Sequence, residues 1–186
     1  MHISRKAFHA SGIVIVLLYR GLDVDRGVAA WLLWAVVALL ALLDALRAYV
    51  PAMQALFLNS FRLIVDPKDE RGLNGSTLYF AGCALAVTLF DRDAACGGIL
   101  ALAVGDSMAA IIGSAVRSPR WGRVSLAGSG ACFVFSTVAI LLLGVHPWHV
   151  AVAGGVAAAL LEAFSGTKLD NLTMPVGVAL VLSLLA

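Results

Sequence analysis

The sequence predicts an all-α fold, a polytopic membrane bundle of about seven transmembrane helices with one further helix at the membrane surface. Hydrophobic residues make up 61% of the 186 residues and charged residues only 13%, whereas an ordinary soluble domain carries about 25% charged residues. The apolar residues gather in seven stretches, and Lys and Arg concentrate in alternate segments between them. Little chain remains outside these stretches, so residues 1–186 are expected to form a single integral membrane catalytic domain.

Each apolar stretch predicts one helix, since roughly 20 residues cross the ~30 Å hydrocarbon core of a bilayer. The predicted spans are residues 7–20, 28–48, 74–90, 94–116, 125–144, 148–164 and 172–186.

The segment between the second and third spans mixes apolar residues with Gln54, Asn59 and Arg62. This pattern favours an interfacial helix, about 51–64, over a further span. Pro51 is suited to begin that helix, and Asp66-Pro67 to end it.

The distribution of Lys and Arg predicts the orientation. Three of these cations, Arg20, Arg26 and Arg92, lie on one side of the predicted spans, and the other ten lie on the side of the N-terminus. This bias predicts a cytoplasmic N-terminus in the cell membrane. Most polar motifs share that side, so the active site is expected to face the cytoplasm.

Overall composition excludes several other classes. The net charge of +2 gives no indication of nucleic-acid binding, and no nucleic-acid partner is expected. Cys83, Cys96 and Cys132 lie inside apolar stretches without a CxxC pattern, so they are expected to be buried free thiols rather than disulfide or zinc ligands.

Asp106 lies near the middle of the span 94–116. A carboxylate at such a position costs about 3 kcal/mol on insertion scales, so it must face protein or water. Gly98, Gly105 and Gly113 allow neighbouring helices to approach closely. We expect a packed polar pocket around Asp106, with a purely structural hydrogen-bonded Asp as the alternative.

Two cationic motifs precede predicted helices on the cytoplasmic side. Arg5, Lys6 and His9 share one face of the first helix, where they suit either phosphate oxygens or anionic lipid headgroups. Arg123 precedes Ser125 and Ser129 in a similar pattern of cation, small hydroxyl residue and helix. A positive-inside loop explains the arginine of the second motif equally well.

Polar residues also open the third span, at Asn74, Ser76 and Thr77. They are expected to cap the helix, and its free N–H groups suit an anion. No Gly-Lys-Ser/Thr follows, which excludes a P-loop.

The segment between the last two spans carries Glu162, Lys168, Asp170 and Asn171. Carboxylate and amide oxygens suit Mg²⁺, which keeps waters and bridges substrate phosphates. The alternative is that Asp170 only caps the last helix. Considered with Asp106 and the basic residues, the segment suggests a Mg–nucleotide site beside a lipid-accessible pocket.

Five motifs occur in the order found in one known family. They are Arg5-Lys6-x-x-His9, Leu73-Asn74-Gly75-Ser76-Thr77-x-Tyr79, Gly105-Asp106-x-x-Ala109-Ala110-x-x-Gly113, Ser125-x-x-Gly128-Ser129 and Glu162…Asp170-Asn171-Leu172-Thr173-x-Pro175. The chain resembles the membrane polyprenol kinases, which comprise dolichol kinase, phytol kinase and the CTP-dependent diacylglycerol kinase, and which are related to the phosphatidate cytidylyltransferases. The resemblance covers almost the whole chain.

The resemblance implies transfer of the γ-phosphoryl group of CTP to a lipid hydroxyl with Mg²⁺. It implies that Arg5, Lys6, Asp106 and Gly113 are critical positions, and that Glu162, Asp170 and Asn171 are further site residues. The chain departs from the family motif at Val124 and Ala127, where Lys and Glu are common, and Arg123 is the candidate to replace the missing cation.

Together, the residues and the resemblance lead to three groups of candidates. The predicted catalytic residues are Asp106, Arg5 and Lys6; the predicted nucleotide-binding residues are His9, Asn74, Ser76, Thr77, Gly113, Arg123, Ser125, Ser129 and Lys168; and the predicted metal ligands are Asp170, Asn171, Glu162 and Asp106. Asp106 orients or deprotonates the lipid alcohol in one alternative and binds the metal in the other.

Two other functions compete with the lipid kinase. A phosphatidate cytidylyltransferase would use similar ligands but release pyrophosphate and a CDP-lipid. A small transporter would use Asp106 as an ion or proton relay, although short loops opposite the polar motifs argue against a pathway across the membrane. The glycine-rich spans also favour a homodimer.

Overall fold

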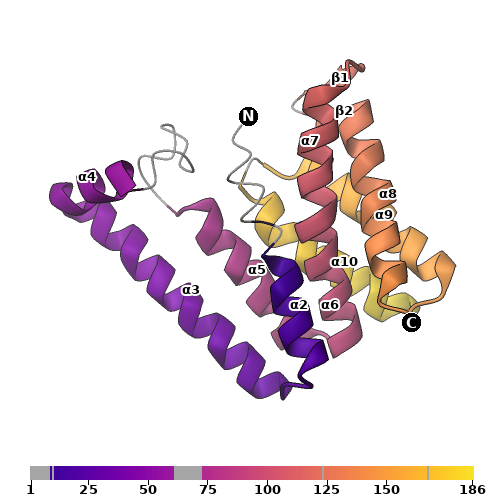
Figure 1. The fold of residues 1–186 in the computed structure, drawn as a ribbon, viewed down its shortest axis with the longest axis horizontal. Coiled ribbons are helices and arrows are strands. Elements are labelled where there is room, and N and C mark those ends of the chain that lie inside the picture. The colour runs from indigo at the N-terminus through magenta and orange to yellow at the C-terminus, as the bar shows by residue number, and fades with distance from the viewer. Residues whose placement is uncertain (1–8, 10, 61–72, 123, 167) are drawn as a thin grey trace.

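The computed structural model describes residue 9 and the ranges 11–60, 73–122, 124–166 and 168–186. Helices form most of this part of the chain, which confirms the all-α prediction (Figure 1). The elements are α2 (Gly12–Gly21), α3 (Arg26–Tyr49), α4 (Pro51–Ser60), α5 (Gly75–Leu89), α6 (Arg92–Leu100), the π-helical segment η2 (Ala101–Asp106), α7 (Ser107–Ala115), β1 (Arg120–Trp121), β2 (Val124–Ser125), α8 (Leu126–Leu142), α9 (Trp148–Phe164) and α10 (Asp170–Leu185).

In the part of the chain that the structure describes, two helical segments are long and apolar enough to cross a membrane, namely Arg26–Tyr49 and Arg92–Ala115. The other apolar helices of the described residues contain 10–17 residues. The structure therefore supports two candidate spans, and the predicted total of seven stays a prediction.

The second candidate span is the centre of the bundle. It consists of α6, η2 and α7 in one continuous helical segment, and α8, α9, α10 and α2 pack against its central π-helical part. A π-helical segment widens the helix and is frequent at functional sites. Asp106 is its last residue and is buried.

Glycine allows the closest of these helix contacts. A Cβ built on Gly98 of α6 would lie 2.2 Å from the carbonyl oxygen of Pro175 in α10. Because the obstacle is backbone, only glycine permits this crossing. Met174, Val178 and Leu182 of α10 are fully buried beside it.

Helix α3 lies along one edge of the bundle (Figure 1). It packs against α5 and α4, and its buried residues are Ala29, Leu33, Asp44 and Arg47. The following helix begins at Pro51 as predicted and ends at Ser60; residues 61–64 of the predicted interfacial helix lie outside the described residues.

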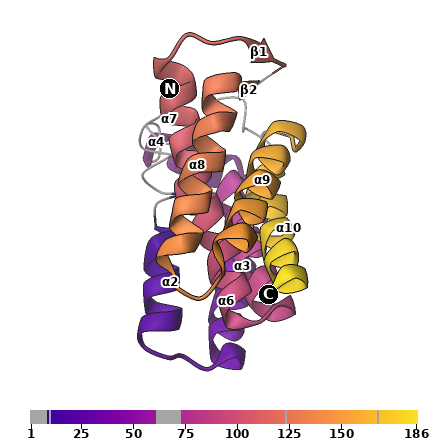
Figure 2. The same ribbon diagram turned by 90° about the vertical axis from the view of Figure 1, so that its right-hand side faces the viewer.

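The all-α prediction needs one small correction. Residues Arg120–Trp121 and Val124–Ser125 pair as an antiparallel two-stranded hairpin between α7 and α8. Gly122 at its turn has a φ of 61°, a conformation that favours glycine. The hairpin lies at the end of the bundle opposite the α2–α3 turn (Figures 1 and 2).

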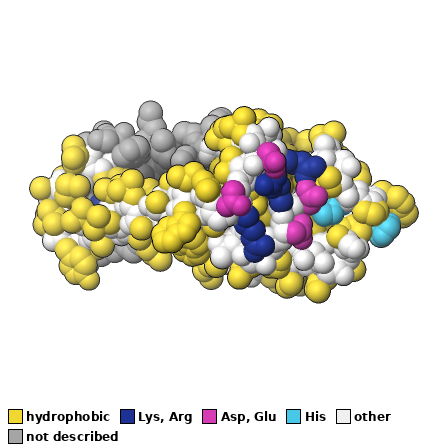
Figure 3. Space-filling view, turned by 90° about the horizontal axis from the view of Figure 1, so that it is seen from below, with side chains coloured by type: hydrophobic (Ala, Val, Ile, Leu, Met, Phe, Trp, Pro, Cys, Tyr) yellow, Lys and Arg dark blue, Asp and Glu magenta, His cyan; other side chains and the backbone are white. Residues whose placement is uncertain are grey.

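The end of the molecule that carries the α2–α3 turn holds a cluster of paired charges (Figure 3). Arg20 pairs with Asp93, and Arg92 pairs with Asp23. Arg26 donates to the carbonyl oxygens of Val87 and Thr88. The three cations predicted to lie on the non-cytoplasmic side are thus all engaged with groups of their own chain.

Candidate active site

Asp106 contacts a histidine from the other end of the sequence. Its Oδ2 lies 3.0 Å from Nδ1 of His9, and both side chains are buried. A buried carboxylate needs such a partner, because desolvation without one costs several kcal/mol. The predicted polar pocket around Asp106 therefore includes His9.

Tyr79 of α5 fixes the position of His9 from a second side. Its hydroxyl donates to the His9 carbonyl oxygen at 2.8 Å, and the two ring centroids are 5.1 Å apart. Tyr79 is fully buried. The motif that contains Tyr79 predicts no role for this residue, and the structure shows that its hydroxyl holds the backbone of His9 in place.

Asp170 and Asn171 begin α10 and are both buried. The backbone N–H of Asn171 donates to Asp170 Oδ1 at 2.9 Å, and its side-chain amide donates to the Gly75 carbonyl oxygen at 3.1 Å. The N-cap position is Leu169, so the alternative that Asp170 is the N-cap is wrong. Asp170 instead occupies the first helical turn, where the helix dipole favours a negative charge.

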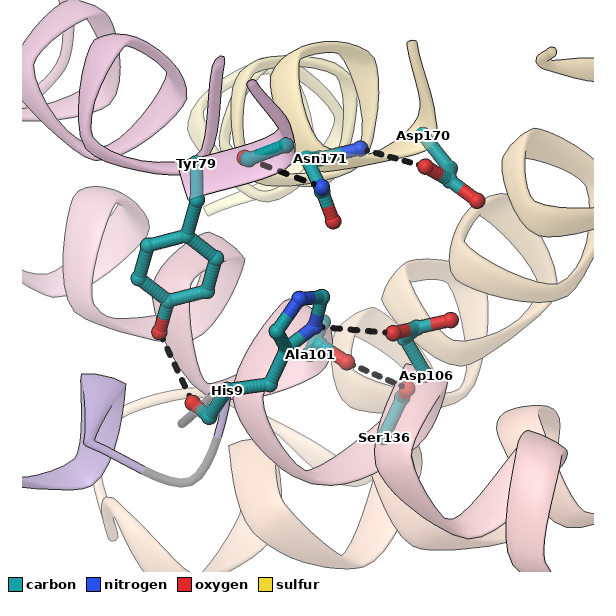
Figure 4. Close-up of polar contacts among 8 residues, drawn as sticks. His9, Tyr79, Ala101, Asp106, Ser136, Asp170 and Asn171 are labelled. Carbon is teal, nitrogen blue, oxygen red and sulfur yellow. Dashed lines mark hydrogen bonds and ion pairs between the residues drawn. The ribbon is translucent and has the colours of Figure 1, made fainter. Parts of the chain in front are cut away.

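These residues surround one common space (Figure 4). Asn171 and Asp170 lie on one side of it, His9 and Asp106 lie on the other, and Tyr79 closes a third side. Ser136 of α8 stands beside Asp106 and donates to the Ala101 carbonyl oxygen at 3.4 Å. Segments separated by more than 60 residues thus bring two acidic side chains, an amide and an imidazole together.

Glu162 and Ser129 form a neighbouring contact between α9 and α8. The Ser129 hydroxyl donates to Glu162 Oε2 at 3.3 Å. Ser165 and Thr173 join the end of α9 to the start of α10 through their hydroxyls, 2.7 Å apart. Lys168, between these helices, donates to the Leu73 carbonyl oxygen at 3.4 Å.

Gly113 and Ser125 have structural partners. Ser125 caps α8 by accepting from the Gly128 N–H at 3.1 Å, and its hydroxyl lies 3.4 Å from the Gly113 carbonyl oxygen. A Cβ on Gly113 would lie 2.8 Å from the Ser125 hydroxyl oxygen. Both residues therefore hold α7 against α8, and their predicted contact with nucleotide stays a prediction.

Asn74, Ser76 and Thr77 open α5 as predicted, but the capping group comes from another helix. Asn74 is the N-cap without a capping bond from its side chain. Asp44 of α3 accepts both from the Asn74 N–H and from the Thr77 hydroxyl. Sequence reasoning missed Asp44, although a carboxylate within an apolar run was the same signal that identified Asp106.

Three predicted site residues, Arg5, Lys6 and Arg123, lie outside the described residues. Their predicted contacts with phosphate stay predictions.

The fit of Mg²⁺ can be judged from the donor set. Within the described part of the chain, no group of three or more His, Cys, Asp or Glu side chains is arranged to hold a metal ion. Mg²⁺ in nucleotide sites commonly binds one or two carboxylates and takes its other ligands from phosphates and water. Asp170 and the Asn171 amide beside it suit Mg²⁺ that is bound together with phosphates. They do not supply enough ligands for a metal site made of protein groups alone.

Comparison with known proteins confirms the resemblance to lipid kinases that use CTP. The chain is 34% identical over 141 residues to CTP-dependent diacylglycerol kinase 1 of Eremothecium gossypii, a match covering 73% of this chain and 44% of that protein. It is 26% identical to CTP-dependent diacylglycerol kinase 1 of Saccharomyces cerevisiae over 94% of this chain and 70% of that one.

A third relative, an uncharacterised protein of Rickettsia prowazekii, is 27% identical over 95% of this chain and 90% of its own length. The chain thus spans less than half of the Eremothecium protein but nearly all of the Rickettsia protein. No protein-family model and no solved structure matches the chain.

Proposed function

We propose that the chain is a CTP-dependent lipid kinase, which transfers the γ-phosphoryl group of CTP to the hydroxyl of a membrane lipid alcohol. The observation that carries the proposal is the meeting of His9 and Asp106 with Asp170 and Asn171 around one space (Figure 4). The names of two relatives support CTP as donor and diacylglycerol as the first acceptor to test. Polyprenols and phytol-like alcohols, which present one hydroxyl on an apolar tail, are the other acceptors.

Phosphoryl transfer requires alignment and charge neutralisation more than covalent chemistry. Mg²⁺ supplies part of that neutralisation when bound with the triphosphate. Asp170 and Asn171, with Glu162 as a further candidate, would hold it. Asp106, positioned by its contact with His9, is assigned to orienting the lipid hydroxyl, in preference to its alternative role as a metal ligand.

Cationic residues are assigned to the phosphates. Lys168 lies between α9 and α10, next to the buried start of α10. The positive end of the helix dipole at this helix start and a nearby ammonium together suit an anion. Arg5, Lys6 and Arg123 are proposed to complete the basic rim.

The membrane location is also part of the proposal. The two long apolar helices and the composition support an integral membrane protein. We propose seven spans with the N-terminus and the active site on the cytoplasmic side. The glycines that favoured a homodimer, such as Gly98 and Gly113, make their close contacts within one chain, so the homodimer stays an untested prediction.

The deciding experiment supplies the purified protein with radiolabelled CTP or ATP, Mg²⁺ and either a panel of lipid alcohols or phosphatidate, and identifies both products. We expect CDP and a lipid monophosphate. Pyrophosphate with a CDP-lipid, formed from phosphatidate, would instead establish the cytidylyltransferase. Solute flux in proteoliposomes without nucleotide would establish the transporter.

A further inference from the structure

Asp44 and Arg47 form a second buried polar pair, outside the group drawn in Figure 4. Arg47 Nη2 lies 3.2 Å from Asp44 Oδ1, and the two side chains are 4% and 8% exposed. The Arg47 guanidinium also lies over the Phe57 ring of α4, 4.0 Å from its centroid. A buried ion pair is a poor source of stability, since desolvation offsets most of the attraction. Its presence therefore calls for another explanation.

The other carboxylate oxygen of Asp44 holds the start of α5. Oδ2 accepts from the Asn74 N–H at 2.8 Å and from the Thr77 hydroxyl at 2.6 Å. Asn74 supplies no capping bond from its own side chain. A carboxylate at a helix N-terminus satisfies free N–H groups and interacts favourably with the helix dipole, and here α3 provides it.

The start of α5 is in turn bonded to the start of α10. The Gly75 carbonyl oxygen accepts from the Asn171 side chain at 3.1 Å. The approach is close, because a Cβ on Gly75 would lie 3.2 Å from Asn171 Nδ2. Asn171 then donates its N–H to Asp170. Asp44 is thus two hydrogen-bonded steps from the buried residues that begin α10.

We propose that Asp44 is a positioning residue of the active site, which fixes the start of α5 and, through Gly75 and Asn171, the start of α10. This inference rests on the proposed function for its kinetic consequence. The proposed function assigns the start of α10 to the Mg²⁺-bound triphosphate, so loss of Asp44 raises the KM for CTP and leaves the KM for the lipid alcohol unchanged. A residue that only stabilised the fold would reduce the amount of active enzyme without separating the two KM values.

The kinetic test uses the full chain in nanodiscs and the double variant Asp44→Leu/Arg47→Met. The double change removes both charges together, because a lone buried Arg would itself destabilise the protein. We expect the KM for CTP to rise about tenfold, as a displacement of the binding groups by a fraction of an ångström would produce. The KM for the lipid should stay within about twofold.

Two further variants sharpen the comparison. Thr77→Val removes one hydroxyl from the Asp44 cluster with little change in shape, and should raise the KM for CTP by a smaller factor. Asp23→Asn is the matched control, because it removes a carboxylate from an ion pair at the opposite end of the bundle. Asn tolerates the φ of 50° at that position, and this variant should keep both KM values.

Hydrogen exchange tests the same inference without using activity. In the wild-type chain the Asn74 N–H is protected by its bond to Asp44. In the double variant, faster exchange is expected at residues 74–77 and 170–173, and no change at residues 91–96.

The outcomes separate the inference from the proposed function. A wild-type chain that does not transfer phosphate from CTP overturns the proposed function, while hydrogen exchange still tests the coupling. A wild-type KM for CTP in the folded double variant overturns the inference, as does unchanged exchange at the start of α10. If the double variant does not fold, an unchanged KM for CTP in Thr77→Val overturns the inference instead.

Discussion

At the scale of single residues, the contact between His9 and Asp106 is central to the proposed chemistry. Burial of the Asp106 carboxylate or of the His9 imidazole without a polar partner would be unfavourable. Their contact partly offsets the cost of removing both side chains from water. Both are buried, and Tyr79 fixes the histidine backbone. The pair is therefore held in one geometry rather than free to turn.

Replacement of Asp106 by Asn tests this contact. The amide keeps the size of the side chain but removes its charge, so the lipid hydroxyl should be oriented less precisely. We expect kcat to fall about a hundredfold, as a misplacement of the reacting hydroxyl by about 1 Å would produce. The measurement is lipid monophosphate formed from radiolabelled CTP, with protein folding checked by thermal unfolding.

Asp93→Asn serves as the control for Asp106→Asn, since it makes the same chemical change in the charged cluster at the far end. It should retain near wild-type kcat. A folded Asp106→Asn protein with full activity would remove Asp106 from the proposed site.

Asp106 was identified because a charge interrupts an apolar stretch, and Asp170 and Asn171 because polar residues separate the last two predicted spans. The structure gathers all three around one space (Figure 4), while their predicted roles stay predictions. Asp44 carries the same signal as Asp106 but was missed, because Arg47 three residues later resembled an ordinary cation at the end of a span. Only the tertiary structure shows that the two side chains pair and are buried.

At the scale of elements, the crossing of α6 and α10 positions the start of α10 against the centre of the bundle. Gly98 meets the Pro175 backbone at that crossing. Pro175 lies inside α10 and is buried. Neither Gly98 nor the Pro175 backbone can make room for an added Cβ by changing a side-chain rotamer.

Gly98→Ala should therefore separate the two helices. We expect a loss of roughly 1–3 kcal/mol in the free energy of unfolding, as for an overpacked core, together with reduced kinase activity. Thermal unfolding in detergent checks the change in stability, and the Tm of Gly98→Ala should be lower than that of the wild-type protein.

The matched control for Gly98→Ala is Gly130→Ala in α8, where an added Cβ would meet nothing within 4 Å. Alanine should stabilise that helix by roughly 0.5–1 kcal/mol. Equal changes in Tm for Gly98→Ala and Gly130→Ala would contradict the close crossing of α6 and α10.

The positions of most helices could be predicted from the sequence, because apolar stretches of suitable length specify them directly. The predicted span 74–90 corresponds to α5, and the predicted span 148–164 to α9. The π-helical segment η2 could not be predicted, since its apolar residues fit an ordinary α-helix equally well. The short hairpin between α7 and α8 was also missed, because two-residue strands leave no periodic pattern.

At the scale of the whole molecule, the bundle has two chemically different ends. One end holds the hairpin and the start of α8 (Figure 2). The other holds acidic and basic residues in pairs, with three Arg against four Asp among residues 20–26 and 91–93 (Figure 3). Among the described residues, Arg120 lies in the hairpin at the opposite end, on the side that is predicted to be cytoplasmic.

Single-cysteine labelling tests this orientation. Trp121 in the hairpin is 84% exposed and Leu22 in the α2–α3 turn is 69% exposed, whereas the three native cysteines are buried. With a membrane-impermeant maleimide, Trp121→Cys should react only in inverted vesicles and Leu22→Cys only in right-side-out vesicles. Reaction of both from the same side would contradict the proposed topology.

The unequal lengths of the helices have a consequence for the surrounding lipid. At 1.5 Å per residue, the 24 residues of α3 extend about 36 Å, whereas the 16 residues of α10 extend only about 24 Å. In the proposed membrane arrangement the long helix α3 is accommodated by its oblique course (Figure 1), whereas the short helix α10 favours local thinning of the hydrocarbon layer beside it. A lipid hydroxyl carried by the thinned leaflet lies deeper, closer to the level of the buried acidic residues, so phospholipid chain length is expected to tune the rate of turnover.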